Sequence, residues 1–219
     1  MALRKRDKAI LKDLDLFRVM DRDSIAELHF SNIKRPILAA NSVLLRLVRD
    51  GHIQRSTDFQ PYVYMPIDSQ MKKSSQKIHH YLALLETYKE IKRTVPTIQE
   101  FLIEPRYGGK GSVEPDIFLK FRNTGFFIEV QRTVYSEKLM DEKMDRYVSL
   151  FHANEFEVFP HVLIISNTHY KIDKLPFRVF QANSFTSFLQ SITKQNTTTP
   201  PSQPTPNSNT VRTVIKADI

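Results

Sequence analysis

The sequence contains no cysteine, and only five of its 219 residues are glycine. The lack of cysteine excludes disulfide bonds, thiolate zinc sites and a cysteine nucleophile. No apolar run approaches the roughly 20 residues that span a bilayer, and the charged residues 4–8 lack the following apolar segment of a signal peptide. We therefore expect a cytoplasmic protein without a membrane partner.

The motifs of several enzyme classes are also missing. The seven histidines form no H-E-x-x-H pattern, and neither a P-loop spacing nor a Ser, His and Asp triad pattern occurs. His79 and His80 are interpreted as surface or core-edge residues of a helix rather than as metal ligands. Three of the five glycines lie in residues 106–112, which are either a loop that faces a substrate or a plain connector.

The clearest local pattern is a hairpin at residues 117–130. Two apolar runs flank the turn-forming residues 122–125, which predicts a pair of antiparallel strands. Asp116 opens the first run, Glu129 lies inside the second, and Gln131 follows on the same face of that strand as Glu129. Asp116 and Glu129 should meet at the open end of the hairpin. Two carboxylates beside a polar side chain predict a site for a hard divalent cation, Mg²⁺ or Mn²⁺.

These residues resemble a nuclease signature. Pro115-Asp116, twelve further residues and Glu129-Val130-Gln131 are similar to the PD-(D/E)XK motif, with Gln131 where lysine is usual. The predicted order of helix, strand, hairpin, helix and strand is that of the nuclease core. Over about residues 5–180 the chain resembles the bacterial replication-relaxation proteins of plasmids and other mobile elements. The matching segments are residues 6–11, 26–30, 44–53 and 129–133, followed by Lys143 and Tyr147.

Residues 1–68 are predicted to form a winged helix-turn-helix domain. The pattern begins with helical spacing at residues 6–19 and a capping box of Ser24 and Glu27. A third helix follows between Pro36 and Gly51, with Ile37 and Leu38 in its apolar stripe, and two short strand patterns come after it. The third helix is then the recognition helix. Its candidate DNA contacts are Lys34, Arg35, Asn41, Arg46 and Arg49. The alternative is that these residues form a solvated helix face or a protein-interaction surface.

The rest of the chain divides into a linker, a second domain and a tail. Residues 69–76 are the linker, residues 77–194 the PD-(D/E)XK-like mixed-sheet domain, and residues 195–219, rich in Thr, Ser and Pro, a tail predicted to be disordered. A short strand is predicted at residues 177–180 of the second domain. The fold class is therefore α/β, or α+β over the whole chain. The resemblance implies Glu86, on the first helix of the second domain, as a further acidic catalytic residue. The alternative is a charge on the shoulder of that helix.

Gln131 carries no charge, so the role of the motif lysine is open. Gln131 can orient a water by itself, Lys143 on the predicted helix 136–151 can replace the lysine, or the site no longer cuts DNA. Lys143 lies within the apolar stripe of its helix, where an unpaired lysine is costly. We expect its long side chain to bring the ammonium to Asp116 or Glu129. The alternative is a rotated helix that leaves Lys143 in solvent.

The net charge of +8 is concentrated before residue 111, because residues 111–195 hold ten basic and ten acidic residues. A basic surface in front of an acidic pocket suits a phosphodiester polymer, although net charge also serves solubility alone. We expect a DNA-binding protein of plasmid or mobile-element replication, with a Mg²⁺-dependent endonuclease that nicks or cuts DNA. The alternatives are a DNA-binding regulator whose degenerate nuclease-like domain serves packing or homodimer formation, and a structural scaffold.

Overall fold

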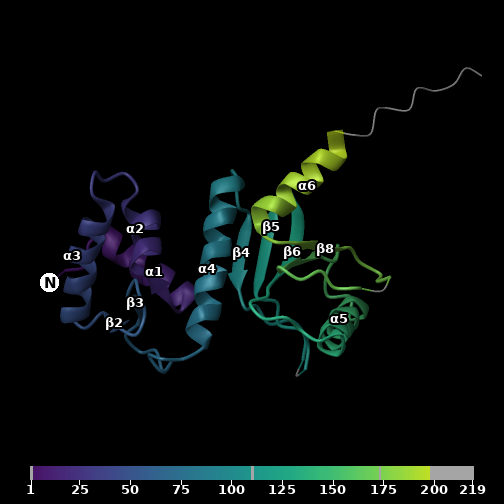
Figure 1. Cartoon of the computed structure of the whole chain (residues 1–219), viewed down its shortest axis with the longest axis horizontal. Helices are drawn as coiled ribbons and strands as arrows, with labels where there is room; N and C mark the ends of the chain where they lie inside the picture. The colour runs from purple at the N-terminus through teal and green to yellow at the C-terminus, as the bar shows by residue number, and fades with distance from the viewer. Residues whose placement is uncertain (1, 110, 173, 198–219) are drawn as a thin grey trace, which may run out of the picture.

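The computed structural model describes residues 2–109, 111–172 and 174–197. Within these ranges the protein has a mixed α+β fold with six helices, a three-stranded antiparallel sheet and a five-stranded mixed sheet (Figure 1). This confirms the predicted fold class. The predicted tail lies outside the described residues from residue 198 onward. Across the described ranges, no helix combines the length and the apolar character that crossing a membrane requires.

Three helices and the small sheet form the N-terminal part. The elements are α1 (Lys5–Phe17), β1 (Met20–Asp21), α2 (Arg22–Phe30), α3 (Pro36–Arg49), β2 (Ile53–Ser56) and β3 (Val63–Pro66). β3 pairs antiparallel with both β1 and β2. Three helices followed by a hairpin is the order of a winged helix. The core of this part is built from Ile10, Leu14 and Phe17 on α1, which are buried against α2 and α3.

Two predictions about these helices are wrong in detail. α2 begins at Arg22 because Asp21, rather than Ser24, is its N-cap and accepts the Ser24 N–H at 2.8 Å. Ser24 and Glu27 therefore form no capping box. α3 has the predicted ends, and Gly51 follows it with a φ of +73°, but the predicted stripe residues Ile37 and Leu38 are exposed.

The second part is built on the five-stranded sheet, in the order β4-β5-β6-β7-β8. β5 runs antiparallel to both of its neighbours, β4 and β6, while β6, β7 and β8 are parallel. α4 and α6 cover one face of the sheet and α5 the other (Figure 1). The elements are α4 (Lys77–Thr94), β4 (Glu100–Ile103), β5 (Ile117–Phe121), β6 (Thr124–Val130), α5 (Glu137–His152), β7 (His161–Ile165), β8 (Val179–Ala182) and α6 (Phe185–Thr197).

The predicted hairpin is present, but its turn is shorter than expected. Arg122 and Asn123 alone connect the strands, with φ of +49° and +58°, and Phe121 pairs with Thr124. Two positive φ angles are typical of a tight turn whose twist matches that of the strands. Gln99 holds this turn, since its Oε1 accepts the Asn123 N–H at 2.7 Å and its Nε2 donates to Asn123 Oδ1 at 2.6 Å.

The C-terminal elements also differ from their predicted bounds. β8 is displaced by two residues from the strand predicted at residues 177–180, and α6 continues to Thr197, beyond the residue 195 at which the tail was predicted to begin. The polar segment expected to join the two domains lies in residues 67–76, which contain neither helix nor strand.

The two parts share packing through α4. The ring of Phe17 lies 4.9 Å from that of Tyr88 and 6.2 Å from that of Phe101. Glu27 on α2 accepts hydrogen bonds from Arg93 and forms an ion pair with Lys89 at 3.4 Å. The parts before and after the proposed domain boundary are therefore packed against each other. The boundary itself stays a prediction.

Candidate functional site

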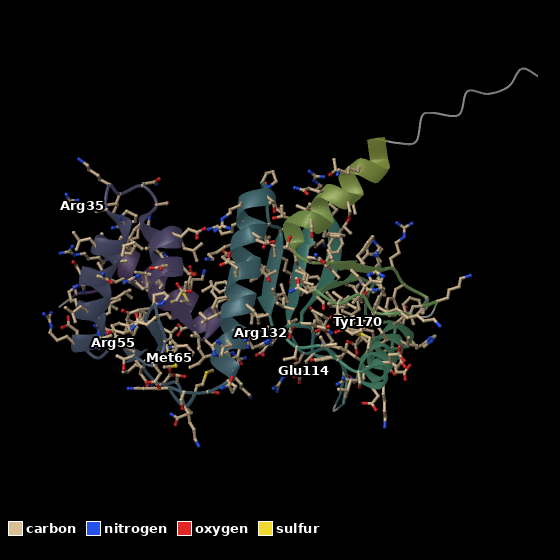
Figure 2. The ribbon with its side chains drawn as sticks, in the orientation of Figure 1. Arg35, Arg55, Met65, Glu114, Arg132 and Tyr170 are labelled. Atoms are coloured by element: carbon tan, nitrogen blue, oxygen red, sulfur yellow. The ribbon has the colours of Figure 1, made fainter. Side chains whose placement is uncertain are left out.

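Most of the predicted catalytic residues meet at the ends of β5 and β6. A cavity of about 190 Å³ opens there, between α4 and α5. Asp116, Gln131 and Lys143 line it, and Glu129 lies beside it, fully buried. Figure 2 labels Arg132, which is exposed and lines the same cavity. The other lining residues are His80, Val130, Thr133 and Tyr135.

Glu129 is fixed by two residues of α5. The preceding residue, Ile128, lies in the core that α4 and α6 cover, and successive side chains of a strand point to opposite faces. Glu129 therefore faces the side of the sheet that α5 covers. Its Oε1 accepts the Tyr147 hydroxyl at 2.6 Å, and its Oε2 forms a hydrogen-bonded ion pair with the Lys143 ammonium. Lys143 and Tyr147 can both reach Glu129 because residues four apart share one face of a helix. The predicted position of Lys143 is confirmed and the solvent-facing alternative is wrong, while its catalytic role stays a prediction.

Each oxygen of the Asp116 carboxylate has a polar neighbour. Its Oδ2 accepts the Val130 N–H at 2.7 Å, and its Oδ1 lies 3.4 Å from His80 Nε2. The side chain retains 17% exposure toward the cavity, whereas Glu129 has none. Asp116 is therefore the more accessible of the two carboxylates.

The site changes the protonation behaviour of its residues. Burial raises the pKa of Asp116 to about 6. Burial, followed by the negative charge of Asp116, raises the pKa of Glu129 to about 7. Burial alone would lower the pKa of Lys143, but the carboxylates of Glu129 and Asp116 raise it above its usual value. Two carboxylates that burial and mutual repulsion disfavour as anions create a demand for positive charge, which Lys143 meets in part.

Gln131 has an unusual environment for a buried amide. Its main-chain N–H donates to the Ile165 carbonyl at 2.9 Å, so the backbone belongs to the sheet edge. Its side-chain Nε2 and Oε1 are both buried and have no hydrogen-bond partner among the described residues. Buried amide groups are nearly always satisfied, so an orphaned one beside a polar cavity indicates a water, an ion or a substrate as its partner.

The side-chain oxygens of Asp116 and Gln131 fit a single divalent cation. Within the described ranges, no group of three or more His, Asp or Glu residues is arranged to hold a metal. Mg²⁺, however, commonly binds one or two protein carboxylates and completes its shell with water and phosphate oxygens. Asp116 and the orphaned Gln131 Oε1 supply oxygens of the required kind. The predicted role of Glu129 as a ligand requires that its bond to Lys143 rearrange.

Glu86 is not brought to this site. Its carboxylate forms ion pairs with Lys89 and Arg93, and the α4 residue that faces Asp116 is His80. Six residues along a helix correspond to a rotation of roughly 600°, which leaves the two side chains on different faces. The interpretation of His80 as a core-edge residue is therefore incomplete, because its imidazole contacts the site.

Glu104, which accepts a hydrogen bond from Tyr81, lies beside the site, and the sequence did not indicate this. The Glu104 N–H donates to the Asp116 carbonyl at 2.9 Å, so the pairing of β4 with β5 brings Glu104 beside the site. Its Oε2 accepts from the Tyr81 hydroxyl at 3.3 Å and lies 3.0 Å from Arg18. Its Oε1 is 3.9 Å from His80 Nε2. Only the register of β4 on β5 could have predicted these contacts.

The predicted DNA contacts on α3 fall into two groups. Lys34, Arg35, Asn41 and Arg49 are exposed, and Arg35 projects from the outer end of the N-terminal part in Figure 2. Arg46 is turned inward, and its guanidinium donates to Asp7 Oδ1 at 2.7 Å, where Asp7 is only 1% exposed. Arg46 is thus a structural residue, and four of the five predicted contacts remain available.

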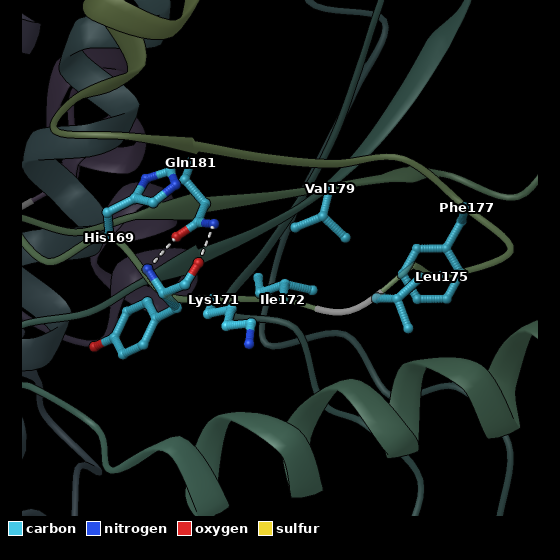
Figure 3. A pocket seen from close by; sticks show the side chains of 8 residues that line it. His169, Lys171, Ile172, Leu175, Phe177, Val179 and Gln181 are labelled. Carbon is cyan, nitrogen blue, oxygen red and sulfur yellow. Dashed lines mark hydrogen bonds between the residues drawn. The ribbon is translucent and has the colours of Figure 1, made fainter.

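A larger cavity lies elsewhere, lined by β8 and by the segment that connects β7 to β8. It measures about 600 Å³ and lies over α5 (Figure 3). Its lining amide, Gln181, is satisfied because Oε1 accepts the Tyr170 N–H at 2.7 Å and Nε2 donates to the Tyr170 carbonyl at 2.9 Å. The described residues that line it include no carboxylate. The cavity at Asp116 has both a carboxylate and an amide without a partner among the described residues, and it is therefore the candidate functional site.

Comparisons with known proteins add little to this geometry. No family model and no curated protein matches the chain. One similar solved structure is that of protein VC1899 from Vibrio cholerae, with 16% sequence identity and a TM-score of 0.39. The alignment covers 84% of this chain and 50% of that protein, so the chain spans about half its length.

Proposed function

We propose that the protein is a DNA-binding endonuclease that depends on Mg²⁺ or Mn²⁺ and acts in the cytoplasm in plasmid or mobile-element replication, as the resemblance to replication-relaxation proteins implies. The observation that carries the proposal is the buried set of Asp116, Glu129 and Lys143 beside a cavity with an orphaned Gln131 amide. Two anions and a cation that are largely removed from solvent are costly to stability, and perturbed carboxylates in a cavity are typical of catalytic sites.

Each residue has a distinct task in this proposal. Asp116 and Gln131 Oε1 would hold the divalent ion, which would lower the pKa of a bound water and neutralise phosphate charge. Lys143 supplies the positive charge that the motif lysine supplies in the resembled family, and Tyr147 keeps Glu129 oriented toward it. Arg132, at the exposed mouth, binds a flanking phosphate.

The test is hydrolysis of supercoiled plasmid by the purified protein. We expect nicked or linear product with Mg²⁺ or Mn²⁺ and none with EDTA. Asp116→Asn is expected to remove the activity, whereas Asp145→Asn, an exposed carboxylate on α5, is the matched control and should retain it. Product formation that is unaffected by EDTA or by Asp116→Asn contradicts the proposal.

One observation favours the regulator as a second candidate. Both oxygens of Glu129 are already engaged, by Lys143 and Tyr147, which is also what a site retained only for packing would look like. Specific DNA binding without cleavage in either metal, with or without formation of a homodimer, would support this alternative.

A further inference from the structure

The outward face of α3 is apolar where a solvated helix would be polar. Leu38 is 57% exposed, Leu45 63% and Ile37 38%. Leu38, Asn41 and Leu45 are spaced by three and four residues, so they share one face of the helix. A single exposed leucine needs no explanation, but apolar side chains gathered on one helix face indicate an interaction surface.

This apolar face is bounded by positive charge. Residues 28–49 contain no Asp or Glu. Exposed Lys34 and Arg35 precede α3, and exposed Arg49 ends it. The partner should therefore be a polyanion that offers apolar groups between its charges. The major groove of duplex DNA has this chemistry, because thymine methyl groups lie between two rows of phosphates.

A second copy of the chain fits this face less well. If two α3 helices packed antiparallel, Arg35 of one copy would lie near Arg49 of the other, and parallel packing would bring each residue beside its own copy. Either arrangement gathers like charges around the apolar contact. Charge complementarity therefore favours DNA as the occupant.

We propose that Leu38 and Leu45 contact thymine methyl groups and that Asn41 between them pairs with adenine, so that α3 selects A·T-containing sites in the major groove. An Asn side chain can bond the N6 and N7 atoms of adenine, and apolar side chains pack on the thymine methyl. This inference rests on the DNA binding in the proposed function and is independent of cleavage.

The experiment selects duplexes from random-sequence DNA with the full chain and then measures affinity at one fixed salt concentration. The selected duplex is compared with the same duplex carrying deoxyuridine for thymidine, which removes only the methyl groups. We expect enrichment of A·T pairs and roughly fourfold weaker binding for each contacted methyl removed. The double variant Leu38→Ala/Leu45→Ala should bind both duplexes alike.

Arg49→Ala is the matched control, because loss of a phosphate contact should weaken binding to both duplexes equally. Equal wild-type affinity for the two duplexes, or a selected site without A·T pairs, overturns the inference and leaves the proposed DNA binding intact. A wild-type dimer that dissociates in the Leu38→Ala/Leu45→Ala variant also overturns it, because the face would then belong to a second copy. Failure to retain any duplex contradicts the proposed function as well.

Discussion

At the residue scale, the site is explained by the cost of burying charge. Glu129 has no solvent contact, yet it carries a carboxylate that an apolar residue of similar size could replace. Replacing a buried ion pair by apolar groups is often neutral or stabilising. The cluster of Asp116, Glu129 and Lys143 therefore lowers the stability of the protein. The proposed hydrolysis explains why the chain has it.

Burial of the Asp116 carboxylate predicts that the free energy of unfolding depends on pH. The Asp116 pKa of about 6 in the folded protein lies above the ordinary value of 3.8, so the folded state holds the proton more tightly than the unfolded chain does. The free energy of unfolding therefore falls as pH rises through this window and levels off above pH 6. In EDTA, Asp116→Asn should raise the melting temperature by a few degrees at pH 8 and have little effect near pH 4.

Scanning calorimetry at the two pH values measures this effect, with Asp145→Asn as the control that should change neither. Saturating Mg²⁺ should reverse the order at pH 8, because only the wild-type carboxylate binds the ion. A variant that is less stable than wild type at pH 8 without metal would be inconsistent with the assigned burial penalty.

At the element scale, the two faces of α3 have different roles. The inward face holds Arg46 against buried Asp7, while the outward face presents Arg49. Arg46→Ala leaves a buried carboxylate without its cation and should destabilise the protein by about 3 kcal/mol. Arg49→Ala should leave the melting temperature unchanged, weaken DNA binding and reduce its salt dependence by about one unit of log-log slope. Thermal melts and salt titrations of the two variants test this difference between the faces. Equal melting temperatures of Arg46→Ala and Arg49→Ala would contradict it.

The elements that could be predicted are those with strong local signals. Pro36 and Gly51 bound α3 through their own backbone preferences, and two apolar runs on either side of a turn define β5 and β6. The errors arose where two local signals compete, as Asp21 and Ser24 do for one N-cap, or where a non-glycine pair adopts positive φ, as at Arg122 and Asn123.

The site could be predicted only in part, for a tertiary reason. Glu129 and Lys143 lie on elements whose faces the apolar pattern defines, and Asp116 directly precedes β5. Their meeting was therefore foreseeable. α4 is buried on more than one side, with Ile78, Leu84 and Leu85 all inaccessible, and its stripe does not reveal which polar residue faces the sheet edge. The resemblance implies Glu86 at this place, whereas the structure has His80 there.

At the scale of the whole molecule, α4 makes the two parts one packed body. A polar path runs from Arg18 through Glu104 to His80 at the site, and Phe17 packs on Tyr88 and Phe101. A protease that cuts within residues 67–76 should therefore leave two fragments that stay associated. We expect the nicked protein to elute from gel filtration as one species at the volume of the intact chain. Separation of the fragments without denaturant would indicate two independent domains instead.

The central claim is that Lys143 provides the positive charge that position 131 lacks. It is tested most directly by the initial rate of supercoiled-plasmid cleavage in Mg²⁺, with DNA affinity measured in parallel. Lys143→Met should lose at least roughly a hundredfold in rate at unchanged affinity, whereas Lys138→Met, whose side chain is 85% exposed on the same helix, should cleave normally. Metal-dependent cleavage by Lys143→Met at the wild-type rate would contradict the account.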